Sequence, residues 1–386
     1  MIITVAGIDN FVSTNSLGIQ AISDGLLTLL KKIFPGAQFI KHLKDYKMSY
    51  EIWKKAFEVD GHPHLYKDYI DEFIENFMEN HPQRVEDIQR SDRVIICGDG
   101  IISDIFPQWC LVLVAEAAIA TANDIPFVTL DQSINTSNNR LTGYAVKKYF
   151  LKSPISVREL NSLKLLKDEF NVDNVNLSID TAFLVDTLSE AEISLFDQYL
   201  EELKDRYEFD HYLVFSARGK RPDFQPIDPR AWGRVIEELS HTFNGSVLFA
   251  SSCPAEDLPL AHDIQVYFRN FIIIDDLVDW GKYNYRFFLY MLEKAVMSIS
   301  DRYHQNVFSL LSKTPFIPVE GNTSKSHGLI EMLKYPFSML PILTDEHLPL
   351  YENKIAEFSL RYNDIKRFLE KNVNIDKFNN YEDFLT

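Results

Sequence analysis

The segment from Lys294 to Pro336 holds the side chains whose types and spacing are best suited to binding an anion. A strand-like run ends at Ile299, two helix-capping residue types follow it, and Arg302 and His304 stand where a helix should start. The unpaired N–H groups and the dipole of a helix start favour an anion, and an arginine adds a fork of parallel donors. The pattern therefore predicts a phosphate or carboxylate site.

A similar arrangement recurs one strand–helix unit later. A second strand-like run leads into a loop that contains Ser324, then to Lys325 and an expected helix over Ser326–Leu333. Consecutive units of a parallel sheet are often neighbours, so we expect Lys325 to lie close to Arg302 and His304.

A purely structural interpretation stays open for the same residues. Arg302 could pair with Asp301 or another nearby acid, and His304 could be a hydrogen-bonded histidine at a helix start. Charged groups at strand ends mark functional sites only as a tendency, so the sequence alone does not separate the two interpretations.

The elements that must position these residues follow a βα rhythm. Short β-branched runs alternate with helical stretches along nearly the whole chain, which is typical of parallel sheets. The expected strands are Ile2–Ile8, Ala37–Leu43, Arg93–Cys97, Pro126–Leu130, Ile155–Arg158, Val175–Ile179, His211–Ser216, Ser246–Ala250, Ile264–Phe268, Ala295–Ile299 and Phe316–Val319.

This rhythm predicts an α/β fold with two doubly wound, Rossmann-like domains that face a cleft. We expect an N-terminal domain over residues 1–187, with a helical insertion at about 50–89, and a C-terminal domain over residues 188–386, with a helical tail from about 350. Sheets of this kind bind ligands at the carboxyl ends of their strands, so the site should lie there.

Composition excludes several classes of function. The 386 residues include 39 Lys and Arg against 56 Asp and Glu, and the resulting charge of −17 lacks the basic footprint of a nucleic-acid-binding protein. No apolar stretch reaches the ~18 residues of a membrane span, and no signal peptide precedes the first strand. The three cysteines indicate buried thiols in a reducing compartment. We expect a cytoplasmic protein without a transmembrane segment, and the sequence leaves open both a peripheral place at the inner membrane and the oligomeric state.

Several segments, in their order and spacing, resemble the polysaccharide pyruvyl transferase family. Arg302-Tyr303-His304 at a helix start, with Lys325 before the next helix, is similar to the family signature. Further segments fit in the same order, so that the resemblance spans roughly residues 2–335. They are Gly98-Asp-Gly100, Phe127–Gln132, Ile155-Ser-Val-Arg-Glu159, Ile179-Asp-Thr-Ala-Phe-Leu184, Leu213–Gly219 and Asp257-Leu258.

The resemblance implies a glycosyltransferase-B-like fold and an enzyme that moves pyruvate from phosphoenolpyruvate to two sugar hydroxyls as a cyclic ketal, in surface polysaccharide or glycolipid biosynthesis. It implies no cofactor and no metal; the partners are phosphoenolpyruvate as donor and a saccharide acceptor, lipid-linked or not. By the same resemblance the catalytic residues are His304, Arg302 and Arg158. The substrate-binding residues are Lys325, Arg218, Lys220, Ser324, Asp99, Asp9 and Gln132.

The donor carries a phosphate and a carboxylate, so an acidic protein must gather several cations in a small volume. His304 could donate a proton or bind phosphate as an imidazolium, whereas Arg158 is permanently charged and can only bind and orient. Four carboxylates after strand ends are candidates for the acceptor side, with turn or capping roles as the alternative for each: Asp9, Asp99, Asp104 and Asp131.

The first half departs from the family pattern, because Asn15-Ser-Leu-Gly18 is followed by Ile19 where the family has an acidic residue. The donor is therefore better supported than the acceptor. Two rival hypotheses stay open: a glycosyltransferase that uses a nucleotide sugar, with Glu320 at the donor ribose, and a family member that has lost transfer and serves as a binding partner. Under the main hypothesis, Arg302→Ala or His304→Ala should abolish transfer and leave the fold intact.

Overall fold

The structure is a computed structural model. It describes residues 1–8, 16–43, 50–98, 100, 102–105, 107–219, 227–268, 271–274, 284–371, 373 and 375–385. The chain forms two compact units. Unit 1 comprises Met1–Ser13, Ile22–Val185 and Ile375–Thr386, and unit 2 comprises Thr14–Ala21 and Asp186–Asn374.

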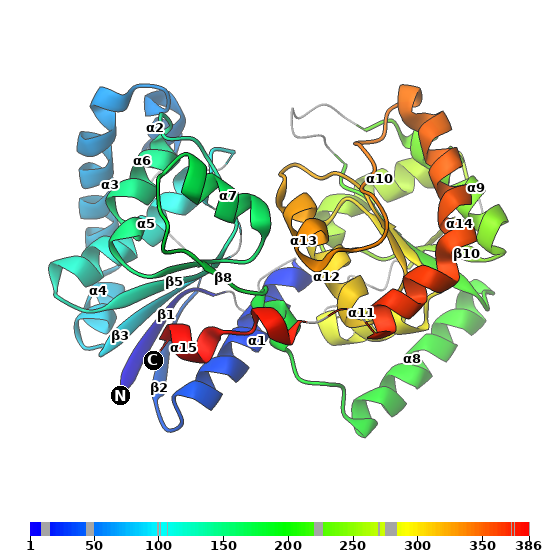
Figure 1. Cartoon of the computed structure of the whole chain (residues 1–386), viewed down its shortest axis with the longest axis horizontal. Helices are drawn as coiled ribbons and strands as arrows, with labels where there is room; N and C mark the ends of the chain where they lie inside the picture. The colour runs from blue at the N-terminus through cyan, green and yellow to red at the C-terminus, as the bar shows by residue number, and fades with distance from the viewer. Residues whose placement is uncertain are drawn as a thin grey trace. The chain divides into compact units, whose positions relative to one another are not determined.

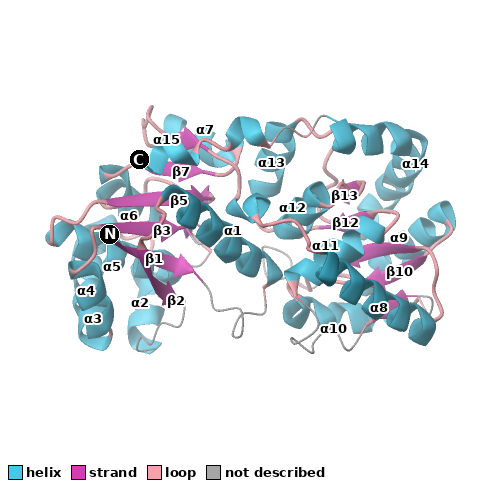
Figure 2. Ribbon diagram, turned by 90° about the horizontal axis from the view of Figure 1, so that it is seen from below, coloured by secondary structure: helices cyan, strands magenta, loops and turns pink. Residues whose placement is uncertain are grey.

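Unit 1 is built on a six-stranded, all-parallel sheet with the strand order β2-β1-β3-β5-β7-β8. Its central strands are continuous apolar runs because helices cover both faces of the sheet (Figure 2). The strands are β1 (Ile2–Ile8), β2 (Gln38–Leu43), β3 (Arg93–Cys97), β5 (Phe127–Gln132), β7 (Ile155–Val157) and β8 (Asn176–Leu177). A further parallel pair, β4 (Ile102–Ser103) with β6 (Ile134–Asn135), lies after the ends of β3 and β5.

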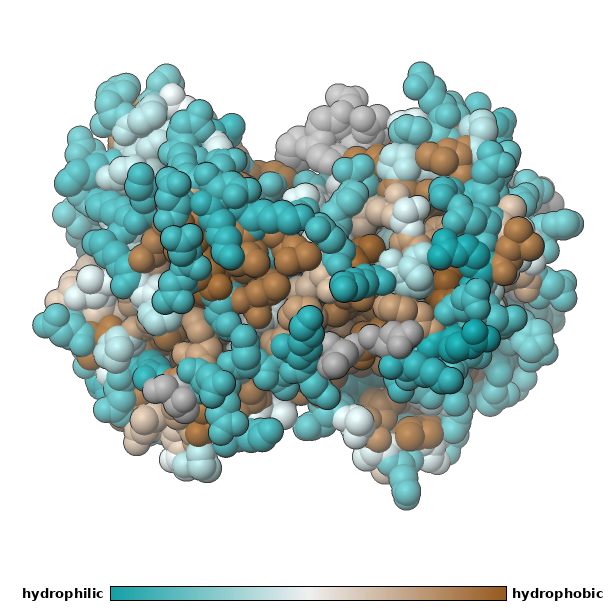
Figure 3. Space-filling view, viewed as in Figure 1, coloured by the Kyte–Doolittle hydropathy of each residue, from teal (hydrophilic) through white to brown (hydrophobic). Residues whose placement is uncertain are grey.

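Helix α5 (Pro107–Ala122) is the centre of the unit 1 core. Every residue from Leu111 to Ala117 is buried, because α5 lies between the sheet and α3 (Tyr66–Asn80) (Figure 1). Helix α3 belongs to the expected insertion at 50–89, which folds as α2 (Tyr50–Val59), α3 and α4 (Pro82–Gln89). The outer surface of this insertion is mostly hydrophilic in the view of Figure 3, so one helical layer completes the core. The remaining helices of the first half are α1 (Leu17–Ile33), α6 (Leu141–Lys148) and α7 (Leu160–Asp168).

Unit 2 holds a five-stranded, all-parallel sheet with the order β11-β10-β9-β12-β13. Its strands are β9 (Tyr212–Ser216), β10 (Ser246–Phe249), β11 (Phe271–Ile273), β12 (Ser298–Ser300) and β13 (Phe316–Pro318). Its helices are α8 (Glu190–Tyr207), α9 (Pro229–Phe243), α10 (Pro254–Gln265), α11 (Tyr285–Lys294), α12 (Tyr303–Leu311), α13 (Lys325–Leu333) and α14 (Leu348–Lys371).

The expected strand at Ile264–Phe268 is wrong. Ile264 is buried as part of helix α10, whereas Val266 and Tyr267 after it are 76% and 51% exposed. The strand of this region is β11, whose Phe271 and Ile273 are buried beside β10. The error arose because a run of β-branched and aromatic residues favours a strand by type, while its burial decides whether it pairs.

The C-terminal tail of the chain belongs partly to unit 2 and partly to unit 1. Helix α14 packs on α9 in unit 2, but the later helix α15 (Tyr381–Leu385) belongs to unit 1, where Tyr381 is fully buried. The side-chain amides of Asn380 and Asn176 exchange hydrogen bonds there at 2.7 and 3.0 Å.

Along the described ranges, no helix is both long enough and apolar enough to span a bilayer.

Candidate functional site

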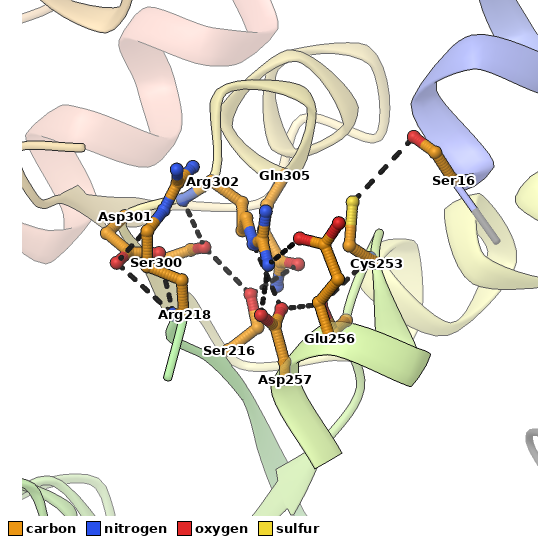
Figure 4. Close-up of polar contacts among 11 residues, drawn as sticks. Ser16, Ser216, Arg218, Cys253, Glu256, Asp257, Ser300, Asp301, Arg302 and Gln305 are labelled. Atoms are coloured by element: carbon orange, nitrogen blue, oxygen red, sulfur yellow. Dashed lines mark hydrogen bonds and ion pairs between the residues drawn. The ribbon is translucent and has the colours of Figure 1, made fainter. Parts of the chain in front are cut away.

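Three segments of unit 2 bring polar side chains to the carboxyl edge of its sheet. They are the loop after β9, the start of α10 after β10, and the start of α12 after β12 (Figure 4). Strands β10 and β12 both flank β9, so the three strand ends are neighbours. We call the group the unit 2 polar cluster: Ser216, Arg218, Cys253, Glu256, Asp257, Ser300, Asp301, Arg302 and Gln305.

Serine and glutamine side chains join the strand ends at the centre of this cluster. The hydroxyls of Ser216 and Ser300 lie 2.8 Å apart, and Ser216 also contacts Oε1 of Gln305 at 3.0 Å. The Nε2 amide of the fully buried Gln305 has no hydrogen-bond partner among the described residues. The centre of the cluster thus presents one unused donor.

Arg302 is held by acids from α10. Its Nε donates to Asp257 Oδ2 at 3.0 Å, its Nη2 donates to Asp257 Oδ1, and Nη2 also donates to Glu256 Oε2 at 2.9 Å. Asp257 is fully buried, and its other neighbour is the Ser251 hydroxyl. Burial raises the pKa of Asp257, and the guanidinium opposes that rise. Arg302 therefore pairs with an acid, as the structural interpretation allowed, but its partner is distant in sequence and is not Asp301.

Pairing does not use every donor of Arg302. Its Nη1 makes no hydrogen bond to any residue that the structure describes, whereas Nε and Nη2 are saturated. The backbone N–H of Arg302 donates to Ser300 Oγ at 2.9 Å, and Arg302 occupies the N-cap position of α12. The helix start is therefore fixed, and one edge of the guanidinium is left for a ligand.

Arg218 is bound very differently. Its backbone N–H lies 3.2 Å from both carboxylate oxygens of Asp301, and its Nε is 3.6 Å from Asp301 Oδ2. That Nε is buried, and the side chain is 14% exposed, yet none of its guanidinium N–H groups donates a hydrogen bond to a described residue. A buried unsatisfied donor costs about 1–3 kcal/mol. Burial and, to a smaller extent, Arg302 lower the pKa of Arg218, although an arginine keeps its charge.

His304 lies against the first turn of α1. A Cβ on Gly18 would come within 2.1 Å of the imidazole, so only glycine permits this approach. The turn itself is fixed because Leu17 N–H donates to Ser252 O at 2.8 Å. His304 is 9% exposed and its ring meets that of Tyr303 edge-on at 5.2 Å.

Lys325 reaches the start of α12. Its Nζ lies 5.4 Å from the centroid of the Tyr303 ring, and Tyr303 stands between Arg302 and His304 in sequence. Lys325 thus approaches the tyrosine of this motif, and its closeness to Arg302 and His304 themselves stays a prediction. Ser324 is exposed at the N-cap position of α13 and makes no side-chain capping bond.

Arg158 lies in unit 1 and is fully buried. Its Nε donates to Ser133 Oγ at 2.8 Å and its Nη1 to Asp180 Oδ2 at 2.7 Å. Asp180 in turn accepts from the Ala182 N–H at 2.8 Å. Arg158 therefore ties the segment after β5 to the segment after β8, while the carboxylate of the adjacent Glu159 caps α7.

Asp131 and Gln132 end strand β5. Asp131 has a left-handed backbone (φ 53°), and its buried carboxyl meets Thr181 N–H at 3.0 Å and Ser178 Oγ at 2.9 Å. Burial, then the nearby Asp180, raises the pKa of Asp131 to about 7. The buried Gln132 donates to Leu130 O at 3.2 Å, and its Oε1 has no partner among the described residues.

The other expected site residues differ in what can be said of them. Asp9, Asp99 and Lys220 lie outside the described residues. Asp104 accepts from the Thr136 hydroxyl at 2.5 Å, and burial raises its pKa. Within the described ranges, no three His, Cys, Asp or Glu side chains are grouped so as to hold a metal ion.

Sequence reasoning missed the residues that hold the candidate arginines. Asp257 enters the sequence pattern only as a position of the family resemblance. The pattern marks neither Asp180, which holds Arg158, nor Tyr381, which bonds to Asp131. The Tyr381 hydroxyl bonds to Asp131 Oδ1 and Ile179 O. An acid in the first turn of a helix is common, so no local signal marked Asp257 as a partner 45 residues away.

Solved structures with similar folds support the architecture. UDP-GlcNAc 2-epimerase from Neisseria meningitidis, bound to UDP-GlcNAc, superposes with a TM-score of 0.55 at 12% identity, over 100% of this chain and 97% of that one. UDP-GlcNAc 2-epimerase from Methanocaldococcus jannaschii gives 0.53 at 12% identity, over 100% and 97%. The S. aureus MnaA–UDP structure gives 0.53 at 13% identity, over 98% and 91%. At such identities the likeness shows the fold alone, and that fold is glycosyltransferase-B-like.

Sequence comparison adds one family. No curated protein sequence matches the chain. The family model described as polysaccharide pyruvyl transferase matches residues 18–323. The matched segment includes Arg158, Arg302 and His304, and it ends two residues before Lys325.

Proposed function

Because the chain belongs to the polysaccharide pyruvyl transferase family, we propose that it transfers pyruvate from phosphoenolpyruvate to two hydroxyls of a saccharide as a cyclic ketal. The observation that carries the proposal is the grouping at the start of α12. Arg302 Nη1 donates to no residue in the described part of the chain, His304 follows two residues later, and the Lys325 ammonium lies over the ring of the tyrosine between them. Phosphoenolpyruvate has two anionic groups on a three-carbon frame and needs cations placed this closely.

The donor side is assigned to unit 2. In this proposal Arg302 offers Nη1 and Lys325 offers an ammonium, and the dipole and first N–H groups of α12 favour an anion at the same helix start. Ser324 adds an exposed hydroxyl at the start of α13. His304, whose position is set by Gly18, is the proton donor or the imidazolium that binds the leaving phosphate.

The reaction needs one proton donor and one base. A proton is added to the methylene carbon of the donor, and a sugar hydroxyl then attacks the adjacent carbon and loses its own proton. The second hydroxyl attacks the same carbon as the carbon–oxygen bond to phosphate breaks, and its proton leaves with the phosphate group. The products are the cyclic ketal and inorganic phosphate, with no redox change. Stabilising the leaving dianion is the task that fixed cations perform best.

The acceptor side is assigned to unit 1, with different roles from those of the family resemblance. Because Arg158 is fully buried and paired, it acts as a positioning residue: it holds Ser133, next to Gln132. In this proposal the side-chain oxygen of Gln132, which no described residue contacts by a hydrogen bond, accepts from a sugar hydroxyl. Asp9 and Asp99 are the proposed carboxylates for the acceptor side. The pathway is proposed to operate in the cytoplasm, on a precursor of a surface polysaccharide or glycolipid.

The first experiment is binding of the donor followed by turnover. Thermal unfolding is measured with and without millimolar phosphoenolpyruvate, because a ligand that binds only the folded state raises Tm. Phosphate release and the mass of the product are then measured on a panel of saccharides. Turnover requires a mass gain of one pyruvate less one water.

The variants must avoid a folding artefact. Arg302→Ala would leave Asp257 buried and unpaired, which is strongly destabilising, so this variant should not keep the fold intact, contrary to the expectation from the sequence. His304→Gln and Lys325→Ala are better tests, with Lys366→Ala on the exposed face of α14 as the matched control for the lysine. We expect both site variants to lose turnover and the control to keep it. A Tm shift with uridine or guanosine diphosphate but none with phosphoenolpyruvate would instead support a nucleotide-sugar transferase, and donor binding without turnover on any acceptor would support a binding protein.

A further inference from the structure

The described arginines of the two candidate sites differ in what their guanidinium groups bind. Arg302 donates to two acids and Arg158 to a serine and an aspartate. Arg218 sits in the same cluster as Arg302, yet its side chain donates no hydrogen bond to any described residue. Buried arginine donors are normally satisfied, so an acceptor from outside the protein is the simplest complement.

Asp301 holds Arg218 without saturating it. The carboxylate takes the backbone N–H of Arg218 with both oxygens and approaches Nε only to 3.6 Å. An ion pair at that distance offsets charge and fixes the direction of the side chain, but it leaves the planar fork unbonded. The arrangement is that of a held guanidinium whose donors are still available.

Gly321 lies beside the end of the Arg218 guanidinium. A Cβ built on this glycine would lie 2.7 Å from Asp301 O and 3.8 Å from Nη2 of Arg218. Any larger residue would be forced into the Asp301 backbone and would cover the end of the fork. Because residue 321 is a glycine, the loop that leads from β13 to α13 places no side chain against the end of the fork at this position.

A second unused donor belongs to the same cluster. The Nε2 amide of Gln305 is buried without a partner among the described residues, while its Oε1 is occupied by Ser216. Ser216 is two residues before Arg218, at the end of the strand that leads to it. Two orphan donors around neighbouring strand ends match a ligand group with several acceptor oxygens.

We propose that Arg218 is the phosphate-binding arginine of this site, and that its fork takes two oxygens of the phosphate group. The inference rests on the proposed function for the identity of the donor, but the phosphate assignment stands on the geometry of Arg218. Arg302 belongs to the same cluster (Figure 4), and its like charge, after burial, lowers the pKa of Arg218, so the two guanidinium groups repel each other. A dianion relieves that repulsion better than a monoanionic carboxylate.

The experiment measures the affinity of three probes by titration calorimetry: phosphoenolpyruvate, inorganic phosphate, and pyruvate, which has the carboxylate alone. The variants are Arg218→Gln and Arg218→Lys, with Arg367→Gln on the exposed face of α14 as the control for the same charge change. Loss of a bidentate charged contact should lower the affinity for phosphate and for phosphoenolpyruvate by about tenfold or more, and it should leave the affinity for pyruvate unchanged. Arg218→Lys should fall between, because the ammonium keeps the charge and loses the fork.

The outcomes separate the two proposals. If wild-type protein binds phosphoenolpyruvate and both Arg218 variants bind it with the same affinity, this inference is overturned and the proposed function still stands. If the Arg218 variants bind pyruvate more weakly but phosphate as tightly as wild type, the inference is also overturned, because the arginine then binds the carboxylate. If wild-type protein binds phosphate but not phosphoenolpyruvate, and Arg218→Gln loses the binding of phosphate, the inference is supported and the proposed donor is contradicted. Binding of none of the probes by wild-type protein overturns both. Circular dichroism of each variant confirms that it is folded.

Discussion

Replacing Asp131 with asparagine should stabilise the protein at neutral pH and flatten the dependence of its stability on pH. The Tyr381 hydroxyl has one hydrogen but faces two acceptors, Asp131 Oδ1 and Ile179 O. A proton on Asp131 resolves the conflict, because the carboxyl then donates to the phenol and the phenol donates to the carbonyl. The Ser178 hydroxyl, which also faces Asp131 Oδ1, then donates to Val157 O, at 3.3 Å. Asparagine offers Nδ2 as the same donor, keeps an oxygen for the Thr181 N–H, and tolerates the left-handed backbone.

The magnitude follows from the pKa of Asp131. Burial and the neighbouring Asp180 raise this pKa from 3.8 to about 7. Between those values the folded protein holds a proton that the unfolded chain has lost, so stability falls as pH rises. A tenfold change in proton affinity corresponds to about 1.4 kcal/mol, and the contribution lost between about pH 4 and about pH 7 is therefore roughly 4 kcal/mol. Below about pH 4 the whole contribution is present.

The assay is urea unfolding of wild-type protein and Asp131→Asn from about pH 5 to about pH 8. Over this range the variant should gain roughly 3 kcal/mol of stability relative to wild type, because the pH rises about two units before it passes the pKa of Asp131, and the gain should level off above about pH 7. Asp364→Asn on the exposed face of α14 is the control, and it should show no such trend. Parallel profiles for wild type and Asp131→Asn would refute the reasoning. A variant less stable at every pH would show that the ionised carboxylate is the form that Tyr381 binds.

Three further outcomes follow from other contacts. Asp257→Leu should lower the free energy of unfolding in urea by about 3–5 kcal/mol, because Arg302 is left without its main partner. Adding Arg302→Met should recover most of this loss, and no recovery would show that the two residues are not coupled. Gly18→Ala should lower the free energy of unfolding in urea by about 1–3 kcal/mol, because the added methyl group overpacks against His304. The loss should be smaller when His304 is also replaced by alanine. Equal losses with and without His304→Ala would contradict the close approach. The side-chain bond from Arg286 lowers the pKa of Glu192 to about 2, so this pair stabilises the protein above about pH 4.5 and the contribution disappears as pH falls toward about 2. Because Glu192 is 32% exposed, Glu192→Gln should lower stability at neutral pH by only about 1 kcal/mol, and an identical acid-unfolding midpoint would contradict the assignment.

The parts of the fold that could be predicted were those that burial imposes locally. Strands such as β1 and β3 are covered on both faces, so their continuous apolar runs are visible in the sequence. The start of α12 was predictable because a strand end, two capping residues and a periodic helix stand in succession. Ile264–Phe268 shows the limit, since its residue types favour a strand and only the neighbouring β10 decides which run pairs with it.

The site was predictable by residue type but not by partnership. Arg158, Arg302 and Arg218 all followed strand ends and all looked like anion ligands. Their partners come from residues 22, 45 and 83 positions away, and nothing in a local pattern distinguishes a guanidinium that is saturated from one that is open. The structure separates the three: Arg158 and Arg302 each donate to acids, whereas the Arg218 side chain donates to no residue in the described ranges.

The nesting of unit 2 within the sequence of unit 1 constrains the order of assembly during synthesis. Residues 186–374 leave the ribosome after the body of unit 1 and before the segment that completes it. The Asp131 carboxyl is thus made 250 residues ahead of the Tyr381 hydroxyl that it needs. Until that residue emerges, the nascent unit 1 carries a buried acid without its phenol partner. We expect its sheet to stay open to local unfolding at β8 through most of translation, and the final closure to wait for the folding of the whole second unit.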